Sequence, residues 1–378
     1  MMKMHRKLIR LSAALLCLIM LTGCWDAKEL DDLSIPLVVA YDTILEKEKE
    51  YPDDKYLVTV GVPVFYEDVE SKFHVIDTTG QIIGEARGRK NTQLGEQVIF
   101  GQLQVLLLGE ELAKKENLLE ITDVIARNPR VKASIFIIIV KGRAVDLIKK
   151  PPHNYPNVGI YLKALMKNSK DTNFFPYTTL FRFNRSLISY ETAALLPHVI
   201  CRDGEIMLAG SCLVNEGKIS GEMGREETET AVMLSGIECK GTLSFEAKKD
   251  GKVIDEATFE GRNSRKVTLK IIEGKYVFNI QIKLSGTIVE HKKEVPMQDG
   301  TDLLMVFQDS LEQHIKKRAE ALVEKTQEEF KFDALCLAKY IKAHTREKLT
   351  KEDIDRIVQE SEINVEVKVQ IRNVGGKM

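Results

Sequence analysis

Two nearly continuous apolar segments on either side of an amphipathic segment constrain the fold more than any other feature of this sequence. The segments FGQLQVLLLG (100–109) and KASIFIIIVKG (132–142) read as strands, and EELAKKENLLEITDVIARN (110–128) has the apolar spacing of a helix. Strand, helix and strand in this order predict a βαβ unit with parallel strands. Strands without polar alternation are typical of burial on both faces. We therefore expect these two strands in the interior of a covered sheet.

Two further strands are predicted before this unit. They are LSIPLVVAYD (33–42) and KYLVTVGVPVFY (55–66), and the charged loop between them is expected to protrude into solvent. Because Pro36 and Pro63 cannot donate a backbone hydrogen bond to a neighbouring strand, we expect both strands to lie at sheet edges or to be bulged. A helix is predicted over residues 80–94.

Beyond residue 200 the pattern changes to alternation of apolar and polar residues. Residues 265–291 alternate on both sides of an EGK turn, and other hairpins are predicted at NEGK (215–218) and at Asp250–Gly251, so an antiparallel sheet with one solvated face is expected. Residues 303–330 have apolar residues three or four apart over about 42 Å of helix. We expect this helix to pack on the sheet; a docking helix for a membrane partner is the alternative. Two short helices and a closing strand at 362–374 follow.

The first 24 residues have the order of a bacterial lipoprotein signal. A basic leader and an apolar segment of about ten residues, too short to span a bilayer, precede the box LTGC (21–24). Small residues fit the narrow groove of a signal peptidase, and only a thiol forms the thioether to diacylglycerol. We expect cleavage between Gly23 and Cys24, with S-diacylglycerol and N-acyl (palmitate) groups on Cys24 that anchor the mature chain to a membrane. A plain signal peptide or an N-terminal helix is the alternative.

Together these patterns predict an α+β, or mixed α/β, protein. The expected divisions are a lipoprotein-type signal peptide (1–23), an N-terminal α/β module (24–200) and a C-terminal α+β domain (201–378). The N-terminal module is expected to hold a mixed sheet with the βαβ unit and, at 143–200, a helical part that could be a subdomain. The C-terminal domain is expected to pack an antiparallel sheet with the long amphipathic helix.

An aromatic stretch, NFFPYTTLFRF (173–183), has two interpretations. With Arg182 and Arg185 it could form a ligand platform or a partner-binding patch. We favour the other interpretation, a helix between domains that buries Phe181, Leu187 and Ile188.

Composition excludes one class of partner. The chain has 55 Lys and Arg against 56 Asp and Glu, a net charge of −1, so there is no electrostatic reason to expect nucleic acid. The hydrophobic content of 44% is that of a folded chain.

No residue pattern in the chain predicts catalysis, a cofactor or a metal. The sequence has no GxSxG, P-loop, GxGxxG or HExxH motif, and its histidines lack metal-like spacing. The cysteines beyond the anchor are widely spaced without a CxxC pair, so zinc is not expected and free thiols are favoured over disulfides. They are Cys201, Cys212, Cys239 and Cys336. A carboxylate pair for glycoside hydrolysis stays open, but the favoured interpretation is not an enzyme.

Several segments, in this order, resemble one family. They are LTGCWDAKELDDL (21–33), IFGQLQVLLLGEELA (99–113), RNPRVKASIFIIIVKGRAVDLI (127–148), TTLFRFNRSLIS (178–189), QEEFKFDALCLAKYI (327–341) and EINVEVKVQIRNVG (362–375). Over essentially its whole length the chain resembles the Ger(x)C lipoproteins, the C subunits of GerA-type spore nutrient germinant receptors.

The resemblance implies a location and partners. It places the chain on the outer face of the spore inner membrane, with a polytopic A subunit and a transporter-like B subunit, in nutrient-triggered germination. Direct binding of a small molecule by this subunit is not expected. Two other functions stay open: a solute-binding lipoprotein of a transporter, which predicts two similar βαβ lobes and an aromatic-lined cleft, and a surface hydrolase of the spore cortex.

Overall fold

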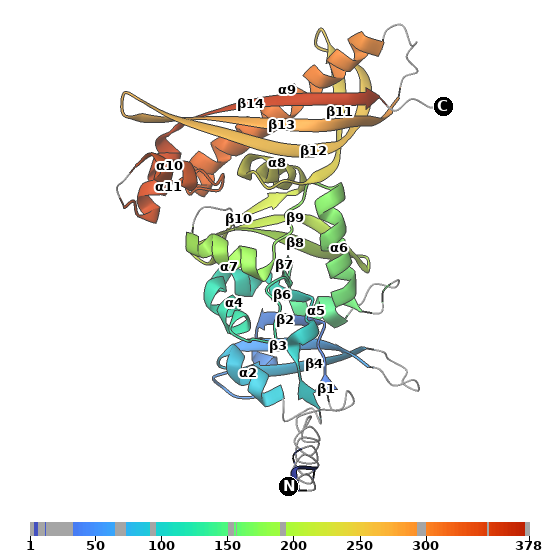
Figure 1. The fold of residues 1–378 in the computed structure, drawn as a ribbon, viewed down its shortest axis with the longest axis vertical. Coiled ribbons are helices and arrows are strands. Elements are labelled where there is room, and N and C mark those ends of the chain that lie inside the picture. Colours follow the sequence, from blue (N-terminus) through green and yellow to red (C-terminus); the bar gives the residue numbers. More distant parts are fainter. Residues whose placement is uncertain are drawn as a thin grey trace.

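The computed structural model describes residues 4–6, 12, 33–64, 73–90, 96–149, 155, 157–189, 194–292, 300–345 and 348–374. Gly23, Cys24 and nearly all of the expected leader lie outside these residues. Within the described part of the chain, no helix is both long enough and apolar enough to cross a membrane. The described chain forms two modules stacked along the long axis of the molecule (Figure 1).

An eight-stranded sheet organises the first module. Its central strands β2, β6, β7 and β8 are parallel, and antiparallel strands extend it on both sides. In spatial order the strands are β10 (Lys218–Gly224), β9 (Glu205–Asn215), β8 (Leu195–Arg202), β7 (Phe136–Val140), β6 (Val105–Gly109), β2 (Val38–Thr43), β3 (Tyr56–Pro63) and β4 (Phe73–Gly80). The prediction of a mixed sheet that contains a βαβ unit is confirmed.

Neighbouring residues of the central strands face different cores. Leu106 and Leu108 of β6 pack into one hydrophobic cluster, while Val105 and Leu107 pack into another on the opposite face. The predicted connecting helix is two helices, α3 (Glu110–Lys115) and α4 (Leu118–Ala126), because Asn117 caps the second one by accepting a hydrogen bond from a backbone N–H of its first turn.

Helices cover both faces of this sheet. One face packs against α2 (Ile83–Lys90), α3, α4 and α7 (Leu180–Ser189), and the other against α5 (Ala144–Lys149) and α6 (Val158–Thr172). The remaining elements of this module are the short strands β1 (Leu33–Ser34) and β5 (Gln97–Val98), which pair in parallel, and the helical turns η2 (Glu46–Glu48) and η3 (Phe100–Gln102).

The expected edge positions of the first two strands are wrong. β2 lies between β6 and β3, and β3 lies between β2 and β4, so neither is at an edge. The prolines are tolerated because Pro36 precedes β2 and Pro63 is the last residue of β3. The connecting loop is exposed over most of its length, as expected, at residues 45–47 and 50–53. The side chain of Asp54 at its end is buried and accepts hydrogen bonds from Thr79 and Arg89.

The first sheet continues beyond residue 200. The expected boundary between residues 200 and 201 falls inside β8, and β9 and β10 still belong to the first sheet. The change of sheet comes after Gly224, through helix α8 (Arg225–Ser235). The limits of the folding domains stay a prediction.

A four-stranded sheet and a long helix form the second module. The sheet order is β11 (Lys240–Lys249), β12 (Lys252–Ile272), β13 (Lys275–His291) and β14 (Glu362–Val374). The predicted antiparallel pairing holds for β11, β12 and β13, whereas β14 pairs in parallel with β13. β14 can pair in parallel because the chain between β13 and β14 crosses the sheet through helices, whereas a tight hairpin turn would make the two strands antiparallel. The helices of this connection are α9 (Gly300–Lys325), the π-helical turn η5 (Thr326–Phe330), α10 (Ala338–His344) and α11 (Lys351–Glu360).

Helix α9 packs on one face of this sheet, as predicted. Phe307, Leu311 and Ile315 are fully buried in the same cluster as Phe278 of β13. The outer face of the sheet is solvated, because alternate strand residues such as Lys283 are exposed.

Candidate partner-binding surface on helix α7

Helix α7 is attached to the first module through its start and its inner face. The backbone N–H of Leu180 donates to the carbonyl of Ile135 at 2.9 Å. The hydroxyl of Thr122 in α4 donates to Asn184 Oδ1 at 2.7 Å. The apolar side chains on the inner face are Leu180, Phe183 and Leu187, which are all buried.

The outer face of α7 exposes two large apolar side chains, Phe181 at 60% and Ile188 at 67%. At 100° per residue these two lie about 20° apart around the helix, whereas Leu187 lies about 120° from Phe181. The expectation that all three are buried is correct for Leu187 and wrong for the other two, because the three side chains do not share a face.

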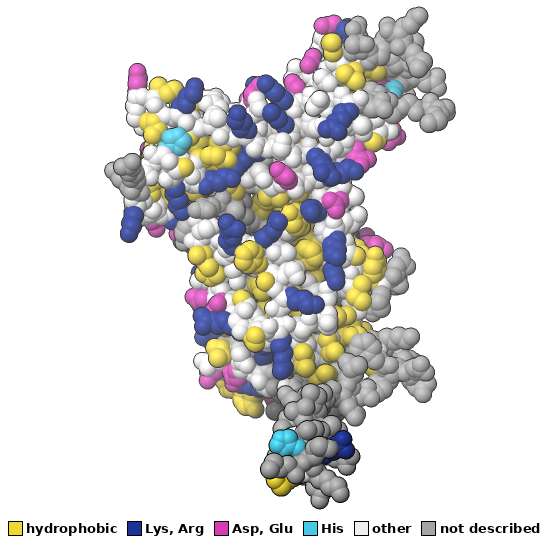
Figure 2. All heavy atoms as spheres, viewed as in Figure 1, with side chains coloured by type: hydrophobic (Ala, Val, Ile, Leu, Met, Phe, Trp, Pro, Cys, Tyr) yellow, Lys and Arg dark blue, Asp and Glu magenta, His cyan; other side chains and the backbone are white. Residues whose placement is uncertain are grey.

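Cationic groups surround this exposed pair. Arg182 and Arg185 lie on the same outer surface, and the helix has no acidic residue. The guanidinium carbon of Arg182 lies 4.3 Å from the ring centroid of Tyr177, and Nζ of Lys170 lies 4.8 Å from the same centroid. Figure 2 shows hydrophobic side chains interspersed with Lys and Arg at the level where Figure 1 places α7.

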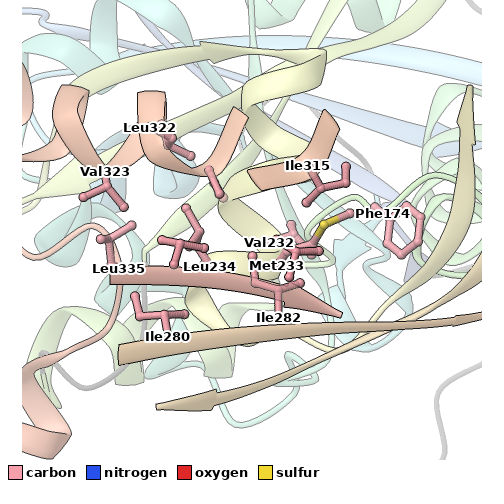
Figure 3. Close-up of a cluster of buried hydrophobic side chains, with 14 of the residues drawn as sticks. Phe174, Val232, Met233, Leu234, Ile280, Ile282, Ile315, Leu322, Val323 and Leu335 are labelled. Atoms are coloured by element: carbon pink, nitrogen blue, oxygen red, sulfur yellow. The ribbon is translucent and has the colours of Figure 1, made fainter. Parts of the chain in front are cut away.

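The surface lies where the two modules meet. Lys342 of α10 donates to the carbonyl of Ser189 at the end of α7, at 3.1 Å. Phe174, from the segment before α7, is fully buried in the core of the second module. Figure 3 shows its ring beside Met233 of α8 and Ile315 of α9. The orientation of the α7 surface is therefore coupled to both modules.

The described cysteines differ in their burial. Cys201 is exposed, whereas Cys212, Cys239 and Cys336 are buried. Burial raises the pKa of the Cys212 and Cys239 thiols to about 12, which keeps them protonated and unreactive. No group of three or more His, Cys, Asp or Glu residues that could hold a metal ion comes together within the described residues.

The α7 surface can contribute to binding in two ways. Covering Phe181 and Ile188 removes apolar area from water, and carboxylates of a partner can pair with the guanidinium groups beside them. An exposed apolar patch next to Arg is typical of a protein interface, where aromatic residues and Arg are enriched. The sequence already contains a signal for this exposed face, because Phe181 and Leu187 are spaced so that they lie about 120° apart around a helix and cannot both face the core.

Family comparisons match most of the chain. The family model described as "Spore germination protein N-terminal domain" matches residues 26–200. The model described as "Spore germination B3/ GerAC like, C-terminal" matches residues 209–375. The chain belongs to the Ger(x)C family of spore germination proteins.

Curated relatives of this Ger(x)C chain are similar along most of their length. Spore germination protein B3 of Bacillus subtilis (strain 168) is 24% identical over 380 residues, which cover 97% of this chain and 98% of that protein. Spore germination protein GerQC of Bacillus cereus is 24% identical over 310 residues, with 81% of this chain and 83% of that protein covered.

A solved structure has the same fold. The crystal structure of the GerBC protein superimposes with a TM-score of 0.58 at 17% sequence identity, covering 88% of the Ger(x)C chain described here and 97% of GerBC. The predicted fold class is thereby confirmed.

Proposed function

We propose that this chain is a lipid-anchored, non-catalytic subunit of a spore nutrient germinant receptor. In this role Cys24 carries the lipid, and the folded chain lies on the outer face of the spore inner membrane beside polytopic A and B subunits. Family membership and the names of the relatives, which are spore germination proteins, support the role in germination. The LTGC box supports the anchor.

The proposal of a protein partner rests on the exposed face of α7. The chain buries Phe183 and Leu187 of this helix completely or nearly so, yet leaves Phe181 and Ile188 more than half exposed. A partner that covers these two side chains and supplies carboxylates to Arg182 would bury the exposed apolar area and pair the cationic group beside it. Because a lipid anchor confines the chain to a membrane surface, a membrane-embedded partner is within reach.

Purification from spore membranes tests this proposal. The tagged chain is compared with the double variant Phe181→Ser/Ile188→Ser, and proteins recovered with each are identified by mass spectrometry. The matched control is Ile271→Ser/Ile272→Ser at the end of β12, where both side chains are about as exposed, at 51% and 52%. We expect the wild type and the control to recover a polytopic protein and a transporter-like protein, and the α7 variant to recover about tenfold less, since it loses the central apolar contacts.

Two results would contradict parts of this proposal. Wild-type protein recovered without either membrane protein would show that it is not a receptor subunit. Equal recovery with the α7 variant would show that α7 is not the contact surface. In a strain that lacks sister receptors, deletion of the gene is expected to abolish germination with at least one nutrient.

The anchor has a separate test. Cys24→Ala removes the thiol that would accept diacylglycerol, so the precursor is expected to stay unlipidated and uncleaved. Mass spectrometry of the purified variant measures the modification. Normal lipidation in this variant would refute the assignment of Cys24.

The solute-binding alternative predicts two similar βαβ lobes. The described part of the first module has parallel central strands with helical connections, whereas the second has three antiparallel strands and one parallel edge strand. Within the described residues the two modules therefore differ in topology, which favours the receptor-subunit proposal.

A further inference from the structure

A cavity of about 550 Å³ opens beside helix α2, at some distance in sequence from α7. Its walls come from α2, from the segment Val98–Phe100 and from the turn at residues 128–130. Three cationic residues line it, Arg87, Lys90 and Arg130, and its described lining contains no Asp or Glu. This volume is within the range of small-molecule sites.

Two glycines keep the α2 side of this cavity open. A Cβ atom placed on Gly84 or on Gly88 would meet no atom within 4 Å, and neither glycine has a left-handed backbone. Since glycine in a helix interior is less stable than alanine, and neither conformation nor crowding requires it here, the effect of both residues is to leave backbone and space facing the cavity.

Among the described residues, the cationic groups of this cavity have no carboxylate counter-ion. Lys90 is only 1% exposed, and its Nζ has no hydrogen-bond partner within the described part of the chain. Burial and, to a smaller extent, the neighbouring Arg87 lower the pKa of Lys90 to about 7. Nζ of Lys90 lies 5.9 Å and the guanidinium carbon of Arg87 4.8 Å from the ring centroid of Phe100.

Arg89, the residue before Lys90 in α2, differs from the cations of the cavity because it has carboxylate partners. Arg89 forms ion pairs with Asp54 at 2.9 Å and with Glu85 at 2.5 Å, whereas Arg87 and Arg130 form none with any described carboxylate. Converging cations without a carboxylate form a site for a small anion, because a bound anion would neutralise charges that are costly to bury alone.

The cavity wall is joined to the segment that leads from the expected anchor. Strand β1 pairs with β5, so that Ser34 lies opposite Val98, and the N–H of Ile99 donates to the carbonyl of Ser34 at 2.8 Å. Leu33, the first residue of β1, is nine positions after Cys24 (33 − 24 = 9), which spans at most about 30 Å. Figure 1 shows β1 and α2 at the same end of the molecule.

We propose that this cavity binds the phosphate group of an anionic phospholipid headgroup. The phosphate accepts hydrogen bonds from Lys90, Arg87 and Arg130, and the glycine-lined side of α2 leaves room for the rest of the headgroup. The choice of a lipid rests on the proposed anchor at Cys24, which holds this end of the chain at a membrane. Free phosphate has the same chemistry and is the second source to be distinguished.

Thermal unfolding of the purified full chain in neutral detergent tests the proposal. Three additions are compared: phosphatidylglycerol, phosphatidylcholine with the same acyl chains, and inorganic phosphate. Ligands that bind the folded state raise its Tm. The variants are Lys90→Met and Arg130→Gln, and the matched control is Lys167→Met, which removes an exposed lysine of α6. We expect phosphatidylglycerol to raise the Tm of the wild type and of the control. Each cavity variant is expected to need a lipid concentration at least about tenfold higher for the same Tm shift.

The outcomes separate the two sources. A shift with inorganic phosphate but none with phosphatidylglycerol would support the anion pocket and overturn the lipid. Equal shifts with phosphatidylglycerol and phosphatidylcholine, or shifts unchanged in both cavity variants, would overturn the pocket. Because the assay uses the purified chain alone, its failure leaves the receptor proposal intact, and failure to recover receptor partners says nothing about this binding.

Discussion

The two sheets of this protein differ in burial: the first is covered on both faces and the second on one. In the first sheet, neighbouring residues of β7 such as Ile138 and Ile139 are both fully buried, in cores on opposite faces. In the second sheet, Ile282 of β13 is fully buried while its neighbour Lys283 is exposed. Covering both faces of the first sheet requires several helices, and our two proposals concern residues of two of these helices, α7 and α2. The second sheet needs helices on one face only.

Alanine substitutions along the strands test this difference most strongly. Ile138→Ala and Ile139→Ala are each expected to lower the free energy of unfolding by about 2–5 kcal/mol, because each leaves a cavity in a separate core. In β13, Ile282→Ala is expected to cost as much, but Lys283→Ala to change stability by less than about 0.5 kcal/mol. Urea unfolding followed by circular dichroism measures the four values. A harmless substitution at Ile138 or Ile139 would mean that one face of the first sheet is not a packed core.

The modules also differ in the partners of two cations, Lys90, which is buried, and Arg265, which is half-buried. Nζ of Lys90 in the first module has no partner among the described residues, whereas Arg265 of the second donates to the carbonyls of Leu335, at 2.7 Å, and Leu234. Lys90→Met is expected to raise the free energy of unfolding at pH 7 by about 1–4 kcal/mol, since it removes a desolvated amine. Arg265→Met is expected to lower it by about 1.5–3 kcal/mol, since it leaves carbonyls unsatisfied. Equal signs for the two variants would contradict this comparison.

The pH dependence of stability sharpens the same contrast. The pKa of Lys90 falls from 10.5 to about 7 on folding, so between these values the unfolded chain holds a proton that the folded chain does not. The free energy of unfolding should therefore rise with pH in this window, by up to about 1.4 kcal/mol per unit, and the contribution should be flat below pH 7. The other cationic residues that line this cavity are Arg87, three residues before Lys90 in α2, and Arg130 of the turn at residues 128–130.

The measurement for this pH dependence is urea unfolding of wild type and Lys90→Met from pH 6.5 to 9.5. The difference between the two proteins should shrink as the pH rises. A constant difference would show that Lys90 keeps an ordinary pKa in the folded chain.

The smallest expected effect concerns thiols and leaves stability unchanged. Cys201, at the end of β8, is exposed, while Cys212, Cys239 and Cys336 are buried. In native protein a maleimide reagent is expected to label Cys201 rapidly and the other three only after unfolding. Peptide mass spectrometry after a short labelling pulse gives the rates. Rapid labelling of Cys239 would mean that the junction between the modules opens in the native state.

Much of the chain could be predicted from local pattern. Periodicity of two located β12 and β13, and apolar spacing of three and four located α9, because both patterns depend on residues close in sequence. The turn at Asp250–Gly251 was predictable for the same reason: Gly251 has a φ of 76°, a conformation that glycine adopts without strain. Edge positions for β2 and β3 were wrong, because a proline only forbids pairing at its own position.

The two candidate sites were harder to predict because they depend on contacts between distant segments. The run ARGRK (86–90) shows three cations in one short helix, but not which of them is paired. Arg89 reaches Asp54, 35 positions earlier, while Lys90 lines a cavity whose third cation, Arg130, comes from a separate turn. On α7, the apolar residues were visible in the sequence, yet which of its faces is open depends on where α4 packs.

The sequence alone determined the element types, the mixed α and β architecture, the family resemblance and the expectation of a lipid on Cys24, since each depends on residues that are neighbours in the chain. The tertiary structure decided that β2 and β3 are interior strands, that β14 is parallel, that Phe181 and Ile188 are exposed, and that Lys90 is buried with no counter-ion among the described residues. Burial and charge pairing are set by which distant segments meet when the chain folds, and a local pattern does not contain that information.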